Sequence, residues 1–95
     1  MNLTKIANLF NSACANDTFI TGVCIDSRKV KPGNLFIALR GENFDGHDFI
    51  QTAVANGAVA VLCTHRDNQL SVPQIVVDDT LQALAKLASY YRETI

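Results

Sequence analysis

The sequence predicts an α/β fold, a three-layer structure in which a mixed β-sheet of about four to five strands carries helices on its faces. Two observations predict it. Segments with helical spacing of apolar residues alternate with short runs of β-branched residues, in the order helix, strand, strand, helix, strand, strand, helix. The runs NLFIAL and AVAVLCT also flank a helical segment, an arrangement that requires a right-handed crossover between two parallel strands.

The N-terminal part predicts one helix and one strand. Apolar residues at helical spacing mark the helix, namely Leu3, Ile6, Leu9, Phe10 and Ala13. Asn2 or Thr4 is suited to cap its start, and the pair Asn16-Asp17 ends it. The run FITGVCID that follows is rich in β-branched and aromatic residues, which is typical of a strand ending near Asp26.

The central part predicts a strand and a second helix. The turn signal KPG precedes NLFIAL, a run apolar on both faces and therefore expected at the centre of the sheet. In DGHDFIQTAVANGA, four apolar residues share one helical face, namely Phe49, Ile50, Ala53 and Val54. Asp45 is suited to cap this helix, and Gly57 is suited to the position just past its end.

The C-terminal part predicts two strands and a last helix. AVAVLCT is typical of a buried strand, and PQIVV of a strand that tolerates a proline at its start. Asp79 or Thr80 is expected to cap the last helix. A stripe of residues at helical spacing is expected to pack against the core, namely Leu81, Leu84, Leu87, Ala88 and Tyr91.

Composition limits the classes of function. The 95 residues suffice for one domain, and 48% of them are apolar, enough for a core. Lys and Arg number eight against nine Asp and Glu, with no basic block, so a nucleic-acid partner is not expected. The chain shows no leader peptide and no stretch of about 18 apolar residues, so we expect no membrane segment and a cytoplasmic location.

Signatures of catalysis and metal binding are missing from the sequence. It contains no phosphate-binding G-x-x-x-x-G-K-[ST] loop, no G-x-G-x-x-G, no G-x-S-x-G and no HExxH motif. The cysteines are odd in number, and Cys63 with His65 lacks the further ligands of a zinc site. We therefore expect reduced thiols, no metal and no catalytic residue in this chain.

Polar residues suited to a ligand follow two predicted strands. IDSR and LRGENFDGHD each leave a strand at its carboxyl end, where open α/β sheets collect ligands. The Ser27 hydroxyl, the Asn43 amide and the Phe44 ring suit a base such as uracil, and Arg28, Lys29 or Arg40 suits a diphosphate. Each also has a structural interpretation, because Asp45 can be only a helix cap and Ser27 only part of a turn.

These stretches resemble a known family. The run DSRKVKPGNLFIALRGENFDGHDF, then AVANGAVAVL and VPQIVVDDTLQALAKLA, is similar to the N-terminal domain of Mur ligases over roughly residues 20–95. These ATP-dependent amide ligases extend the peptide of UDP-N-acetylmuramic acid. Within the family, the residues resemble most the branch that adds D-alanyl-D-alanine. The branch that forms the tripeptide typically carries a histidine where this chain has Glu42.

The resemblance implies a single domain, residues 1–95, that binds the UDP part of a UDP-N-acetylmuramoyl-tripeptide. The implied UDP-binding residues are Ser27, Arg28, Glu42, Asn43, Phe44, Asp45, Gly46 and His47. In the family, ATP and magnesium act in a central domain that phosphorylates a carboxylate, and a C-terminal domain holds the attacking amine. We therefore expect a piece of a longer ligase that is inactive alone, without a cofactor of its own.

Two alternatives remain open on the sequence. The chain could be the same domain of the ligase that adds diaminopimelate or lysine. It could also be a free-standing binding module that uses this fold without joining a ligase, in which case no affinity for uridine is expected.

Overall fold

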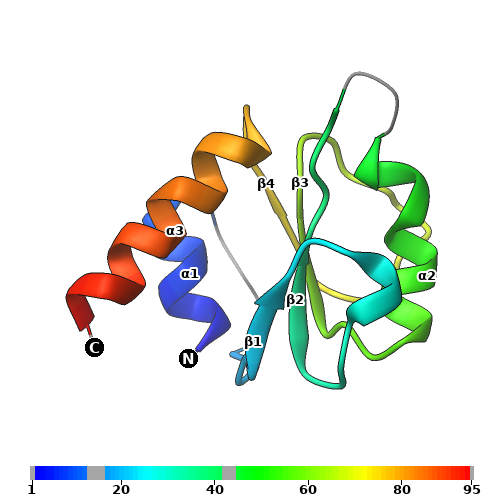
Figure 1. Cartoon of the computed structure of the whole chain (residues 1–95), viewed down its shortest axis with the longest axis horizontal. Helices are drawn as coiled ribbons and strands as arrows, with labels where there is room; N and C mark the ends of the chain where they lie inside the picture. The colour runs from blue at the N-terminus through cyan, green and yellow to red at the C-terminus, as the bar shows by residue number, and fades with distance from the viewer. Residues whose placement is uncertain (1, 13–16, 42–44, 95) are drawn as a thin grey trace.

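In the computed structural model, residues 2–12, 17–41 and 45–94 are described, with side chains up to Tyr90. Four strands form one sheet in the order β1 (Gly22–Cys24), β2 (Asn34–Ile37), β3 (Ala60–Cys63) and β4 (Gln74–Val76). Helices α1 (Leu3–Leu9) and α3 (Thr80–Thr94) lie together on one side of this sheet, and α2 (Ile50–Ala55) lies on the other (Figure 1). The predicted three-layer α/β architecture is confirmed.

All pairings between the four strands are parallel, so the expectation of a mixed sheet was wrong. The reason lies in the connection between β1 and β2, which contains the 3-10 helix η1 (Ser27–Lys29). After this turn the chain returns to the edge of the sheet at which β1 begins. Strand β2 therefore runs in the same direction as β1, and its first residue, Asn34, pairs with Gly22. The antiparallel contacts among the described residues are isolated bridges outside the strands, such as that between Arg40 and Asp45.

Strand β2 has apolar residues on both faces, and each face contributes to a separate core. Leu35 and Ile37 pack with α1 and α3, in a cluster that also holds Ile6 and Leu87. Phe36 packs on the opposite side, in a cluster with residues of α2. Because both faces are covered, the strand occupies the interior position that its continuous apolar run predicted.

Helix ends are held by aspartates. The Asp79 carboxylate accepts hydrogen bonds from the backbone N–H groups of Leu81 and Gln82, at 2.9 and 3.1 Å, which confirms the predicted cap of α3. Asn2 occupies the cap position of α1 without a side-chain cap bond. Asp17 instead accepts from the Thr4 N–H at 3.4 Å, a contact between distant parts of the chain. Local patterns could not predict that contact.

The second predicted helix is confirmed with a change in its first turn. Asp45 caps it as expected, but the residues that follow form a 3-10 helix, η2 (Gly46–Phe49), before α2 begins at Ile50. Gly57 follows the end of α2 with a φ of 117°, a conformation that favours glycine, as predicted.

The core-facing side of α3 differs from the predicted stripe. Leu81 is 65% exposed and Ala88 is also exposed, whereas Ala83 and Leu87 are buried. The ridge that packs on the sheet is therefore formed by Ala83, the half-buried Leu84 and Leu87.

Candidate functional site

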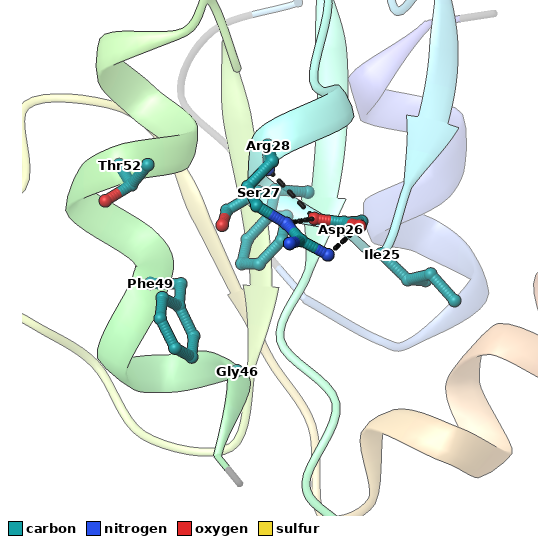
Figure 2. Close-up of a pocket in the computed structure, with 8 residues that line it drawn as sticks. Ile25, Asp26, Ser27, Arg28, Gly46, Phe49 and Thr52 are labelled. Atoms are coloured by element: carbon teal, nitrogen blue, oxygen red, sulfur yellow. Dashed lines mark hydrogen bonds and ion pairs between the residues drawn. The ribbon is translucent and has the colours of Figure 1, made fainter.

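A cavity of about 570 Å³ opens on the α2 side of the sheet, between η1 and the segment formed by η2 and α2. We call it the η1–η2 cavity. It is lined by Ile25, Asp26, Ser27, Arg28, Phe36, Gly46, Phe49 and Thr52. Phe49 and Thr52 face Ser27 and Arg28 across the opening (Figure 2). The structure thus brings together residues that follow two neighbouring strands, as expected from the sequence.

The η1 wall is organised by an ion pair between Asp26 and Arg28. The Asp26 carboxylate accepts from the Arg28 backbone N–H at 2.9 Å, and from Nε and Nη2 of its guanidinium at 3.1 Å each. The side-chain hydrogen bonds from Arg28 hold the pKa of Asp26 below its usual value. Since the Arg28 side chain is 84% exposed, its remaining N–H donors can still meet an anionic ligand.

Ser27 is held in place from the α2 side. Its backbone carbonyl accepts a hydrogen bond of 2.9 Å from the Asn56 side chain, which ties η1 to the end of α2. Ser27 is buried, and its hydroxyl points towards the α2 side of the cavity (Figure 2). The hydroxyl that the sequence predicted as a ligand contact therefore lies at the η1–η2 cavity.

The opposite wall depends on a close approach at Gly46. Its N–H donates to the Leu39 carbonyl at 2.6 Å, and a Cβ at this position would lie 2.7 Å from the same oxygen. Only glycine fits there without a backbone shift. This close contact holds η2 beside Leu39, which follows β2 in the chain. Phe49, at the end of η2, is 42% exposed and lies beside the cavity.

Asp45 and His47 were also predicted to bind the ligand, but the structure places them differently. Neither lines the η1–η2 cavity. The Asp45 carboxylate bonds the His47 backbone and ring, and these hydrogen bonds lower its pKa. His47 lines a second cavity of about 380 Å³, together with residues of the loop after β3 such as His65 and Arg66. Glu42, Asn43 and Phe44 lie outside the described residues.

Several lining residues were not predicted, notably Phe49 and Thr52. The sequence assigned Phe49 to one face of an α-helix together with Ile50, Ala53 and Val54, because these apolar residues have helical spacing. A 3-10 turn has fewer residues per turn than an α-helix, so Phe49 lies on a different face of the segment. Phe36 belongs to the run predicted as a central strand, but nothing in that pattern predicted that it also lines a cavity.

Neither a metal site nor a membrane helix is found in the described ranges. Within them, no group of three or more His, Cys, Asp or Glu side chains could hold a metal ion. Among the same residues, no helix combines the length and the apolar character needed to cross a bilayer. Burial raises the pKa of the Cys63 thiol, which disfavours the thiolate form needed for metal binding.

The fold and the cavity define an α/β domain with a candidate small-molecule site. A family model described as "Mur ligase family, catalytic domain" matches residues 19–92. The chain therefore belongs to the Mur ligase family.

Two relatives with known names cover most of the chain. It is 38% identical over 96 residues to the UDP-N-acetylmuramoyl-tripeptide--D-alanyl-D-alanine ligase of Escherichia coli, covering 100% of this chain and 21% of that protein. It is 42% identical over 89 residues to the UDP-N-acetylmuramoyl-L-alanyl-D-glutamate--2,6-diaminopimelate ligase of Listeria monocytogenes, covering 94% and 18%. The chain thus spans about a fifth of the length of these curated relatives.

Solved structures of the family share the fold. A crystal structure of MurF from Acinetobacter baumannii superposes with a TM-score of 0.80 at 31% identity, covering 96% of this chain and 21% of that one. A MurF ligase from Thermotoga maritima, solved in complex with ADP, gives a TM-score of 0.65 at 35% identity, covering 72% and 16%.

Proposed function

We propose that this chain binds the UDP part of UDP-N-acetylmuramoyl-tripeptide in the η1–η2 cavity, as the N-terminal domain of a ligase that adds D-alanyl-D-alanine in peptidoglycan synthesis. The observation that carries the proposal is the cavity, whose volume of about 570 Å³ lies in the usual range of small-ligand sites. Relatives named for UDP-N-acetylmuramoyl substrates supply the substrate class.

The lining suits the three parts of UDP. The exposed Phe49 ring offers a stacking face for the uracil base, and Phe36 forms an apolar part of the lining. The hydroxyls of Ser27 and Thr52 can exchange hydrogen bonds with base or ribose. The free N–H donors of Arg28 suit the diphosphate, which a guanidinium binds in bidentate fashion.

The other predicted contacts remain part of the proposal. Glu42, Asn43 and Phe44 are proposed to contact the uridine, and Asp45 is proposed to act at the edge of the same site. Gly46 is proposed to meet the ligand through its backbone, which lies in the cavity wall because the missing side chain lets η2 pack directly against Leu39.

In the complete enzyme, this domain would contribute binding energy at a distance from the reaction. Holding the UDP part fixes where the peptide carboxylate lies, and such positioning lowers the barrier of the chemical step. ATP and magnesium are proposed to act elsewhere in a cytoplasmic, full-length ligase.

A second candidate is the same domain in the diaminopimelate-adding ligase, favoured by relatives of that name at up to 47% identity over 72 residues. The two candidates share UDP and differ in the peptide. An activity assay of the complete enzyme decides between them: the proposed ligase consumes tripeptide with D-alanyl-D-alanine, whereas the second candidate consumes dipeptide with diaminopimelate.

The direct test is an amide NMR titration of the 95-residue chain with UDP, and then with uridine, CDP and ADP. We expect saturable shifts at Ser27, Arg28, Gly46, Phe49 and Thr52, with a dissociation constant of about 1 mM or below, equivalent to about −4 kcal/mol. CDP and ADP should bind more weakly, because a site that pairs with the uracil imide leaves polar groups unsatisfied with other bases.

A matched pair of variants assigns the shifts to the cavity. Thr52→Val removes one hydroxyl at nearly constant volume and should weaken UDP binding, whereas Lys5→Ala, at an exposed position of helix α1 across the sheet, should not. Absence of shifts with UDP at several times the expected dissociation constant, or equal affinity for CDP and ADP, would contradict the proposal.

A further inference from the structure

The His47 ring is enclosed although it belongs to a short surface segment. Its side chain is 7% exposed and lies between η2 and the carboxyl end of β3. Nδ1 lies 2.6 Å from Oδ1 of Asp45, and Nε2 lies 3.0 Å from the backbone nitrogen of Thr64. Both ring nitrogens are therefore engaged, one within the segment and one with the sheet.

The geometry selects one form of the ring. The backbone N–H of Thr64 can only donate, so Nε2 must present its lone pair to it. The ring proton of the neutral imidazole then belongs on Nδ1, where it is donated to the Asp45 carboxylate. The lowered pKa of Asp45 agrees with this arrangement, since its carboxylate is stabilised by donors from His47.

Two further contacts hold the ring in its plane. The Thr64 hydroxyl lies 3.2 Å from Nε2. The ring of His65 stacks on that of His47 with centroids 4.4 Å apart and planes 15° from parallel. The imidazole thus meets partners on its edges and on one face.

The remaining side chains of η2 cannot anchor the segment by burial. Gly46 has no side chain, Asp48 is exposed, and Phe49 is 42% exposed beside the cavity. A 3-10 helix of four residues also gains little from its own hydrogen bonds. His47 is thus a buried side chain of η2 that connects this segment to β3, through the hydrogen bond from the Thr64 N–H.

We propose that His47 is a positioning residue for the nucleotide site: as its Nδ1–H tautomer, it fixes η2 to the end of β3 and so holds Gly46 and Phe49 opposite η1. This inference rests on the proposed function and changes the expected role of His47, which acts through Gly46 and Phe49 without touching the ligand.

Three substitutions separate the two halves of the contact. His47→Asn places an amide near the Nδ1 position and retains the bond to Asp45, whereas His47→Gln can reach Thr64 with a carbonyl oxygen. His47→Ala removes both. We expect His47→Ala and His47→Asn to weaken UDP binding about tenfold or more, and His47→Gln to lose less, because of the three only Gln can retain the contact with Thr64 that joins η2 to β3.

A core variant on the other face controls for general destabilisation. Ile6→Val in α1 lowers the melting temperature by loss of a buried methyl group far from η2, and should leave UDP affinity unchanged. The spectroscopic test is ¹⁵N NMR of the His47 ring, in which we expect a protonated Nδ1 and an unprotonated Nε2. In His47→Ala, the amide signals of Gly46 and Phe49 should move even without ligand.

The outcomes are distinct. Wild-type binding with a tenfold loss in His47→Ala, unmatched by Ile6→Val, supports the inference. Wild-type binding with full affinity in His47→Ala, or a ring protonated on Nε2, overturns it and leaves the proposed function intact. A wild-type chain that does not bind UDP overturns the proposed function and the inference that rests on it.

Discussion

The two faces of the sheet differ in how much helix covers them, because, among the described residues, only one of them carries a long helix. On one face lie α1, with 7 residues, and α3, with 15. The other face carries α2, with 6 residues, and the two 3-10 helices, with 3 and 4. Adjacent residues of β2 show the consequence: Ile37 is enclosed in a packed core, whereas Phe36, equally buried, also lines a cavity.

The difference shows how a ligand site can arise on a buried sheet. Helix α3, together with α1, fills most of the space above its face with apolar side chains, and a smaller cavity of about 340 Å³ remains there beside β1. Short elements cannot fill the space, so they are held by polar contacts such as Asn56 to Ser27 and His47 to Thr64. The face that is packed less completely keeps an opening lined by both apolar and polar groups.

The largest expected effect is on the packed face. Ile37→Ala should lower the free energy of unfolding by about 2–5 kcal/mol, the usual cost of such a truncation in a core. Its UDP affinity, corrected for the folded fraction, should equal that of the wild type. Urea denaturation followed by circular dichroism, together with the titration, checks both. A specific loss of affinity would mean that the two faces are coupled.

A smaller loss of stability is expected where η2 approaches the sheet. Gly46→Ala places a methyl group 2.7 Å from the Leu39 carbonyl oxygen and 2.8 Å from its nitrogen, so the backbone must move. Overpacking of this kind costs about 1–3 kcal/mol. Unlike Ile37→Ala, this variant should also weaken UDP binding, because the shift displaces the cavity wall. Unchanged affinity would show that the wall tolerates movement.

Phe49→Ala should reverse the pattern of Ile37→Ala. The ring is 42% exposed, so its removal should change the free energy of unfolding by less than a core truncation does. Loss of a stacking face should weaken UDP binding by about 1–3 kcal/mol, or roughly five- to 150-fold. Isothermal titration with UDP measures it. A binding constant equal to that of the wild type would remove Phe49 from the site.

Local features of this molecule could be predicted from the sequence, whereas contacts between distant segments could not. The apolar run of β2 and the aspartate caps at Asp45 and Asp79 depend on neighbouring residues, and all three predictions are confirmed. The parallel sheet and the cap from Asp17 depend on how distant segments meet.

The candidate site follows the same division. Ser27 and Gly46 could be predicted as site residues because each lies in a segment that follows the carboxyl end of a strand. Both line the cavity. Phe49 was missed because a 3-10 turn and an α-turn cannot be told apart by apolar spacing alone, yet they direct this ring to different faces. The contact of His47 with Thr64 joins residues 17 positions apart, so local patterns in the sequence could not predict it.

The smallest expected effect concerns the ion pair on the η1 wall. Hydrogen bonds from Arg28 lower the pKa of Asp26 from its ordinary value of 3.8. The charge of Asp26 therefore adds stability above that pH, and this contribution is lost as the pH falls through the lowered pKa. Asp26→Asn retains a side-chain oxygen that can accept from the Arg28 backbone N–H, so it removes mainly the charge.

Thermal melts from about pH 6 to about pH 2 should show a modest stability gap between wild type and Asp26→Asn that closes at the acidic end. Salt at about 1 M should shrink the gap at pH 6, because the pair is exposed and screened. A gap that persisted at pH 2 would mean that asparagine disturbs the turn itself. The η1 wall would then depend on backbone geometry, like the wall at Gly46, and the two walls would be alike in what holds them.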